Sequence, residues 1–245
     1  MQHYGLIGYP LGHSFSKMFF SQKFSNEKID AVYEAYPLET IQEFEKLIRT
    51  VTLNGLNVTI PYKEQVIPFL NEINTEAAQI GAVNTIKFIR QNGVFHLVGY
   101  NTDAIGFENS IKPLFQKHHT KALILGTGGA SKAIRYVLEK NGIETQFVSR
   151  SKSDLNLCYQ DLNEALLTEY TVVVNASPVG TFPNEDACPA IPYQFLTERH
   201  LLFDVVYNPS ETMFLKNGRA QGAIGINGAL MLEKQALAAW EIWNT

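Results

Sequence analysis

The feature that most constrains the fold is a glycine-rich turn, Gly126-Thr127-Gly128-Gly129-Ala130. The apolar run Ala122–Leu125 precedes it, and the helical pattern Ser131–Lys140 follows it. This order is typical of a dinucleotide-binding βαβ unit, in which a pyrophosphate meets the helix N-terminus. Ser131 occupies the third glycine position of the G-x-G-x-x-G pattern, but the glycines that form the turn and admit the phosphate are present. The alternative is a glycine loop without a ligand.

Strand and helix patterns alternate on both sides of this turn. The strand patterns are Tyr4–Ile7, Ala31–Ala35, Leu56–Val58, Thr85–Ile89, Val94–Val98, Glu144–Val148, Thr171–Val174 and Leu201–Val206. Helical patterns begin near Ser16 and Asp103 and cover Glu39–Val51 and Gly228–Trp243. Alternation predicts parallel strands in an α/β fold, and Asn92-Gly93 favours a hairpin turn. We expect two α/β domains with a boundary near 101–106.

The end of the strand after the glycine turn indicates which dinucleotide binds. It reads Ser149-Arg150-Ser151-Lys152, without an acidic residue at its tip. An acid there usually binds the ribose 2′-hydroxyl of NAD, whereas arginine suits the 2′-phosphate of NADP. The sequence therefore predicts an NADP(H) site.

Four further stretches are rich in small polar residues, and each falls where a short apolar strand is expected to end. They are Ser14-Phe15-Ser16, Asn57-Val58-Thr59-Ile60-Pro61-Tyr62-Lys63, Ala82-Val83-Asn84-Thr85 and Asn101-Thr102-Asp103. Such side chains supply hydrogen-bond donors and acceptors without bulk, as a site for a small polyol requires. Lys63 adds a proton donor, and Asp103 adds its charge partner. A polyol site beside a nicotinamide site implies hydride transfer between an alcohol and a ketone.

Each of these residues also has a structural interpretation. Ser16 can cap a helix that begins near Lys17, and Asp103 can cap the helix that follows it. Lys63 can be a solvated lysine at the start of a helix. Asn101 can simply brace its turn.

The motifs Asn57–Lys63 and Asn101–Asp103, in this order and spacing, resemble those of the shikimate dehydrogenase family, and the resemblance runs from Tyr4 to about Trp243. It implies NADPH-dependent reduction of 3-dehydroshikimate within aromatic amino-acid biosynthesis. It also implies a substrate-binding domain at 1–102, a Rossmann-like NADP-binding domain at 103–227, and a helix at 228–245 that packs back on the first domain. The substrate would lie in the cleft between the domains.

The resemblance assigns roles to individual residues. Ser14 and Ser16 would bind the substrate carboxylate, while Thr59, Asn84, Tyr207 and Gln235 would join Lys63 and Asp103 at the substrate. The cofactor would meet Gly126, Thr127, Gly128, Gly129, Ala130, Ser149, Arg150, Ser151, Lys152, Ser177, Val205 and Gly228. Met231 fits packing better than chemistry. Lys17 and Phe20 depart from the family, which mostly has proline and histidine there.

Composition excludes several other classes of protein. The 245 residues carry a net charge of −4, which gives no basic surface for nucleic acid. We find neither a signal-peptide pattern nor an apolar run that would span a membrane, so we expect a cytoplasmic protein. Cys158 and Cys188 fit reduced thiols, and the histidine spacing predicts no metal site.

Three alternatives stay open. One is a quinate/shikimate dehydrogenase, and another is a relative acting on a different cyclic hydroxy-acid. The third, from a different class, is a catalytically inactive NADP-binding sensor, which would be expected to lack Lys63 or Asp103. The expected partners are small molecules, and the chain is expected to be a monomer or a homodimer.

Overall fold

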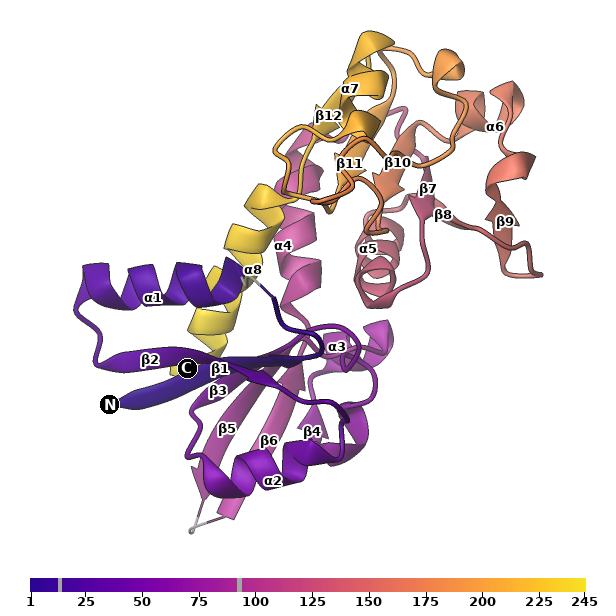
Figure 1. Cartoon of the computed structure of the whole chain (residues 1–245). Coiled ribbons are helices and arrows are strands. Elements are labelled where there is room, and N and C mark those ends of the chain that lie inside the picture. Colours follow the sequence, from indigo (N-terminus) through magenta and orange to yellow (C-terminus); the bar gives the residue numbers. More distant parts are fainter. Residues whose placement is uncertain (13–14, 92–93) are drawn as a thin grey trace. The chain divides into compact units, whose positions relative to one another are not determined.

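The computed structural model describes residues 1–12, 15–91 and 94–245, which form two compact units. The first unit comprises Met1–Gly106 and Leu232–Thr245, and the second comprises Phe107–Met231. Ser14 and the turn residues Asn92-Gly93 lie outside the described residues. Each unit is built on its own sheet (Figure 1), as expected for an α/β chain.

The first unit has a mixed six-stranded sheet in the order β2-β1-β3-β5-β6-β4. Its strands are β1 (Gln2–Gly8), β2 (Ala31–Pro37), β3 (Gly55–Val58), β4 (Glu72–Ile73), β5 (Thr85–Gln91) and β6 (Val94–Tyr100). Strand β1 pairs in parallel with β2 and β3, whereas β5 runs antiparallel to both β3 and β6. The predicted hairpin is therefore present, with Gln91 paired to Val94. Strand β2 forms one edge of the sheet.

Both faces of this sheet are covered by helices (Figure 1). The helices of the unit are α1 (Phe15–Glu27), α2 (Glu43–Thr50), α3 (Thr75–Ile80), the start of α4 (Thr102–Ile111) and most of α8 (Ala229–Asn244). Side chains alternate along β1, so Leu6 joins the core beneath α1 and α8, and Ile7 joins the core beneath α2. The first core is aromatic: Tyr4 stacks on Trp243 with ring centroids 4.8 Å apart. The Trp243 Nε1–H donates to Ile86 O at 3.0 Å, which ties α8 to β5.

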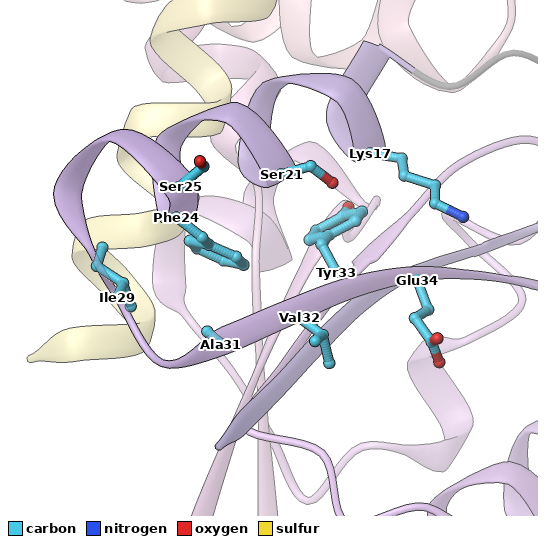
Figure 2. Close-up of a pocket in the computed structure, with 9 residues that line it drawn as sticks. All are labelled: Lys17, Ser21, Phe24, Ser25, Ile29, Ala31, Val32, Tyr33 and Glu34. Carbon is cyan, nitrogen blue, oxygen red and sulfur yellow. The ribbon is translucent and has the colours of Figure 1, made fainter.

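A pocket of about 420 Å³ lies in the first unit between α1 and the edge strand β2 (Figure 2). Lys17 and Glu34 stand at one end of it, Phe24 and Ile29 at the other, and Tyr33 lies between them. Of the predicted substrate-binding residues that the structure describes, none lines this pocket.

The second unit has a fully parallel sheet in the order β12-β11-β10-β7-β8-β9. Its strands are β7 (Lys121–Leu125), β8 (Glu144–Ser149), β9 (Asn156–Cys158), β10 (Val172–Asn175), β11 (Leu201–Asp204) and β12 (Ile224–Ile226). Its helices are the end of α4 (Thr102–Ile111), α5 (Gly129–Lys140), α6 (Glu164–Glu169) and α7 (Met213–Ala220). Strands β10 and β11 are buried throughout, as in a parallel sheet covered on both faces.

Helix ends follow local chemistry closely. Helix α5 ends at Asn141-Gly142 as predicted, because Gly142 adopts the left-handed conformation with φ of 77° that favours glycine. Helix α2 begins at Glu43, four residues after the expected start, and α1 begins at Phe15, one residue before Ser16. Across the described ranges, no helix is both long and apolar enough to cross a membrane.

Candidate active site

An ion pair between Lys63 and Asp103 marks the polar site of the first unit. Lys63 follows β3, and its backbone carbonyl accepts a hydrogen bond from Val83 N at 2.7 Å. Asp103 stands in the first turn of α4. Lys63 Nζ donates to Asp103 Oδ2 at 2.6 Å, and the side chains are only 15% and 3% exposed. A charge pair this short and this protected from water keeps the ammonium in one place.

The local structure decides between the interpretations of Asp103 and Asn101. Asn101 Oδ1 accepts from Ala104 N at 3.2 Å, so Asn101 caps α4 and Asp103 does not. Asn101 Nδ2 donates to Ala82 O at 2.9 Å. Both ends of the Asn101 amide therefore brace its turn, while the Asp103 carboxylate remains available to Lys63.

The Asn84 amide takes part in four side-chain hydrogen bonds. Its Oδ1 accepts from Thr102 N at 2.6 Å, from Thr102 Oγ1 at 3.1 Å and from Thr85 Oγ1 at 3.1 Å. These donors fix the orientation of the amide and direct its Nδ2 outward, where it donates to Gln235 Oε1 at 3.1 Å. Gln235 of α8 thus lies beside Asn84 in the first unit.

A buried chain of hydrogen bonds continues from Asn84 toward α1. Asn57 Nδ2 donates to Thr85 Oγ1 at 3.1 Å, and Asn57 Oδ1 accepts from the Tyr33 hydroxyl at 2.8 Å. Burial raises the pKa of Tyr33, and a hydrogen bond from Ser16 opposes that effect. The site is thus connected from Ser16 to Asn84 through fully engaged polar groups.

The sequence patterns alone assign no role to Tyr33, Asn57, Thr85 or Thr102. The last three lie within the polar stretches of the sequence, so their positions gave a signal. Tyr33 gave none, because one tyrosine in an apolar strand is ordinary core composition.

The remaining substrate-site predictions have different outcomes. Ser16 lies within the first turn of α1, so it does not cap that helix. Thr59 is half-buried, and its methyl group fills the space beside Gly8, where an added Cβ would lie 2.5 Å away. Ser14 lies outside the described residues. Tyr207 belongs to the second unit and is 39% exposed.

The glycine turn of the second unit fits a phosphate. Gly126 has φ of 113°, a conformation that side chains disfavour. A Cβ added at Gly128 would meet no atom within 4 Å, which leaves open space at the N-terminus of α5. Ser131 is fully buried, and its hydroxyl donates to Gly128 O at 2.5 Å. A serine is therefore accommodated where the G-x-G-x-x-G pattern has glycine.

The two cations after β8 differ in their contacts. Lys152 Nζ pairs with Asp161 Oδ1 at 3.0 Å. Arg150 is exposed and has no hydrogen bond or ion pair to any part of the chain that the structure describes. Of the two, Arg150 is therefore the one whose charge is available to a ligand.

Two loops at the carboxyl ends of β10 and β11 are joined by buried Asp204. Asp204 Oδ1 accepts from Asn175 Nδ2 at 2.9 Å and from Val206 N at 3.0 Å, and its Oδ2 accepts from Thr212 Oγ1 at 2.6 Å. Asn175 Oδ1 in turn accepts from the Ser177 hydroxyl at 2.6 Å. Burial raises the pKa of Asp204 to about 6, although these hydrogen bonds oppose the rise.

Gly228 lies against the loop after β11, where its N–H donates to Val206 O at 3.2 Å. A Cβ added to it would lie 2.3 Å from Val205 O, so no side chain fits. Ser177, Val205 and Gly228 therefore lie on ordered backbone of one unit, close to the carboxyl ends of β10 and β11. Within the described residues, no group of three or more acidic, histidine or cysteine side chains could hold a metal ion.

Known proteins are similar to this chain in sequence. The profile of the shikimate dehydrogenase substrate binding domain matches residues 6–86. Shikimate dehydrogenase (NADP(+)) of Carboxydothermus hydrogenoformans is 38% identical over 259 residues, which cover 98% of this chain and 90% of that protein. The chain belongs to the shikimate dehydrogenase family.

Solved structures of the family have the same fold. Shikimate 5-dehydrogenase from Thermus thermophilus, in complex with NADP(H) and shikimate, matches with a TM-score of 0.85 and 30% identity over 99% of this chain and 93% of that one. Quinate dehydrogenase from Corynebacterium glutamicum, in complex with NAD, matches with a TM-score of 0.86 and 26% identity over the same shares. The similarity therefore includes enzymes with different substrates and cofactors.

The two departures from the family pattern in α1 lie in different environments. Phe20 is fully buried and stacks on Tyr33, with ring centroids 4.7 Å apart. It belongs to the aromatic core beneath α1. Lys17 lines the pocket between α1 and β2 (Figure 2).

Proposed function

We propose that this chain catalyses the NADPH-dependent, reversible reduction of 3-dehydroshikimate to shikimate. The observation that carries the proposal is the Lys63–Asp103 pair, joined at 2.6 Å and protected from water. In a member of the shikimate dehydrogenase family, this pair combines a proton donor with a carboxylate acceptor for a substrate hydroxyl.

The first unit would hold the substrate. Ser14 and Ser16 would donate to its carboxylate, and Thr59, Asn84 and Gln235 would bind its hydroxyls. Tyr207 of the second unit would contribute a further contact. The ordered Asn84 amide supports this assignment, because a preorganised group loses little entropy on binding.

Lys63 would supply the proton of the reaction. When bound, NADPH supplies the hydride that the C3 carbonyl carbon receives. The carbonyl oxygen becomes an alkoxide, and the Lys63 ammonium gives it a proton, directly or through water. Asp103 holds Lys63 in position, and solvent returns the proton to the lysine.

The second unit has a place for the cofactor. The turn from Gly126 to Ala130 and the N-terminus of α5 fit the pyrophosphate, because Gly128 faces open space. Arg150, with Ser149, Ser151 and Lys152, would bind the 2′-phosphate. Ser177, Val205 and Gly228 would line the nicotinamide end. The absence of an acid at the tip of β8 supports NADP over NAD.

The test is a set of oxidation assays on the purified chain. Shikimate and quinate would each be offered with NADP⁺ and with NAD⁺, and cofactor reduction would be followed. The proposal requires shikimate with NADP⁺ to give the highest kcat/KM. Quinate with NAD⁺ as the best pair would favour a quinate dehydrogenase. NADP⁺ binding without turnover of either alcohol would favour the inactive sensor.

For assembly we propose a monomer or a homodimer, and for location the cytoplasm. The expectation of small-molecule partners is supported by the Thermus thermophilus enzyme, which was solved in complex with NADP(H) and shikimate. Size-exclusion chromatography with light scattering would test the assembly, and cell fractionation would test the location.

A further inference from the structure

An asparagine beyond the predicted cofactor residues bonds to both sides of Arg150. Asn156 Nδ2 donates to Ser149 Oγ at 2.6 Å and to Ser151 O at 2.7 Å. Ser149 Oγ itself donates to Ser151 O at 2.5 Å. One amide group therefore links the two residues that flank Arg150 and holds the chain on both sides of it.

Asn156 is itself firmly held. It pairs with Phe147 at the start of β9, so it belongs to the parallel sheet. Its backbone N–H donates to Ser153 O at 3.3 Å, and its Oδ1 accepts from the Ser153 hydroxyl. A side chain anchored in this way can transmit the rigidity of the sheet to the loop at its edge.

Arg150 depends on this loop for its position. Its side chain has no hydrogen bond or ion pair to the described part of the chain. Its positive charge lowers the pKa of Tyr159, against the larger opposite effect of burial. Lys152 is held separately by Asp161. The backbone from Ser149 to Ser151 therefore sets the point and direction in which the Arg150 side chain leaves the chain.

We propose that Asn156 is a positioning residue that holds Arg150 ready for the 2′-phosphate and thereby sets the preference for NADP over NAD. This rests on the proposed function, which supplies the cofactor. Without the Asn156 amide, the loop from Ser149 to Ser151 must become ordered when the cofactor binds. The entropy lost in this ordering weakens the binding of NADP, because NADP needs Arg150. NAD has no 2′-phosphate, so its binding does not carry that cost.

The test is a double-mutant cycle with Asn156→Ala, Arg150→Ala and the double variant. KM for NADP⁺ and for NAD⁺ is measured at saturating shikimate. We expect Asn156→Ala to raise KM for NADP⁺ by about five- to twentyfold, with KM for NAD⁺ and kcat within about twofold of wild type. In the Arg150→Ala background, the same change should raise KM for NADP⁺ by less than about twofold.

The matched control is Asn163→Ala in the same unit. Asn163 accepts from Leu166 N at 3.1 Å as the cap of α6 and donates to Asp161 O at 3.2 Å, and within the described residues it has no hydrogen bond to Ser149, Arg150 or Ser151. This control should lower the melting temperature without changing the ratio of the two KM values. If Asn156→Ala does not fold, as judged by circular dichroism, Asn156→Gln displaces the amide by one methylene and gives the same readouts.

Two outcomes overturn the inference alone. One is an equal rise in KM for NADP⁺ and NAD⁺, which would make Asn156 merely structural. The other is full additivity with Arg150→Ala, which would show that the two residues act independently. A wild-type chain without preference for NADP⁺ would overturn the inference together with the proposed cofactor. The wild-type assay therefore separates the two kinds of failure.

Discussion

Lys63 Nζ lies 2.6 Å from Asp103 Oδ2, although the two residues are 40 positions apart in the sequence. The turn after β3 positions the lysine, and the first turn of α4 positions the aspartate. Their contact joins two of the four polar stretches into one site. Substitutions at this pair can therefore test the substrate site. Substitutions in the second unit, which carries the glycine turn, can test the cofactor site separately.

Asp103→Asn should lower kcat/KM for shikimate. The substitution keeps an oxygen acceptor but removes the charge that holds the Lys63 ammonium. A charge-assisted hydrogen bond is roughly twice as strong as a neutral one, so a loss of about tenfold or more is expected. Steady-state kinetics checks it, with Asp30→Asn, which removes an exposed carboxylate, as the control. Unchanged kcat/KM would remove Asp103 from the mechanism.

Ser16→Ala should raise KM for shikimate by about ten- to hundredfold, because a neutral donor to a charged carboxylate is lost. KM for NADP⁺ should not change. Ser14→Ala is expected to behave in the same way. Ser21→Ala, which removes an exposed hydroxyl from the same helix, is the control. If the substitutions raise KM for a substrate analogue without the carboxylate as much as they raise KM for shikimate, the serines act through structure alone.

Arg150→Ala should weaken NADPH binding by about 2 kcal/mol or more and leave NADH binding nearly unchanged. Fluorescence titration with both cofactors measures this. Lys152→Ala should have the smaller effect, because Lys152 already pairs with Asp161. Equal losses for NADPH and NADH would show that Arg150 does not bind the 2′-phosphate.

Asp204→Asn should change how stability depends on pH. Burial raises the pKa of Asp204 to about 6 from 3.8, so the folded state binds the proton more tightly than the unfolded state. Its contribution is fully present below pH 3.8 and is lost as pH rises through about 6. Between about pH 4 and 7, the wild type should therefore lose roughly 2 kcal/mol of unfolding free energy relative to Asp204→Asn. Urea denaturation at several pH values measures this, and a difference that is independent of pH would contradict it.

Long, strongly patterned elements were predictable from the sequence. The glycine turn with its strand and helix appears as β7 and α5, and the parallel sheet of the second unit follows from the alternation of elements. Helix α8 was expected at Gly228–Trp243 and spans Ala229–Asn244. Periodicity reports such elements well, because each must bury one continuous apolar face.

Short elements were not predictable in the same way. Helices α3 and α6 have six residues each, which is less than two turns of periodicity. Side-chain caps on Asn74 and Asn163 hold them instead. Strands β4 and β9 have two and three residues and exist only through pairing with their neighbours. Tertiary contacts, and not local propensity, determine these segments.

The candidate site was predictable as a set of residue types but not as a network. The stretches containing Asn57, Asn84 and Asp103 were found because small polar side chains gather after strands. Which of them bond to one another depends on strand register, which a single sequence does not fix. Asn156 was missed for the same reason: its role depends on the pairing of β9 with β8.

The turnover of Lys63→Ala with shikimate and NADP⁺ is the most direct test of the proposed chemistry. A positioned general acid contributes about 10²- to 10⁴-fold, so kcat should fall by that factor while cofactor affinity changes little. Lys23→Ala is the control, because Lys23 forms an ion pair of the same 2.6 Å length with Glu27 within α1 and has no proposed role in the reaction. A kcat for Lys63→Ala within about twofold of the Lys23→Ala value would contradict the assignment of Lys63 as proton donor.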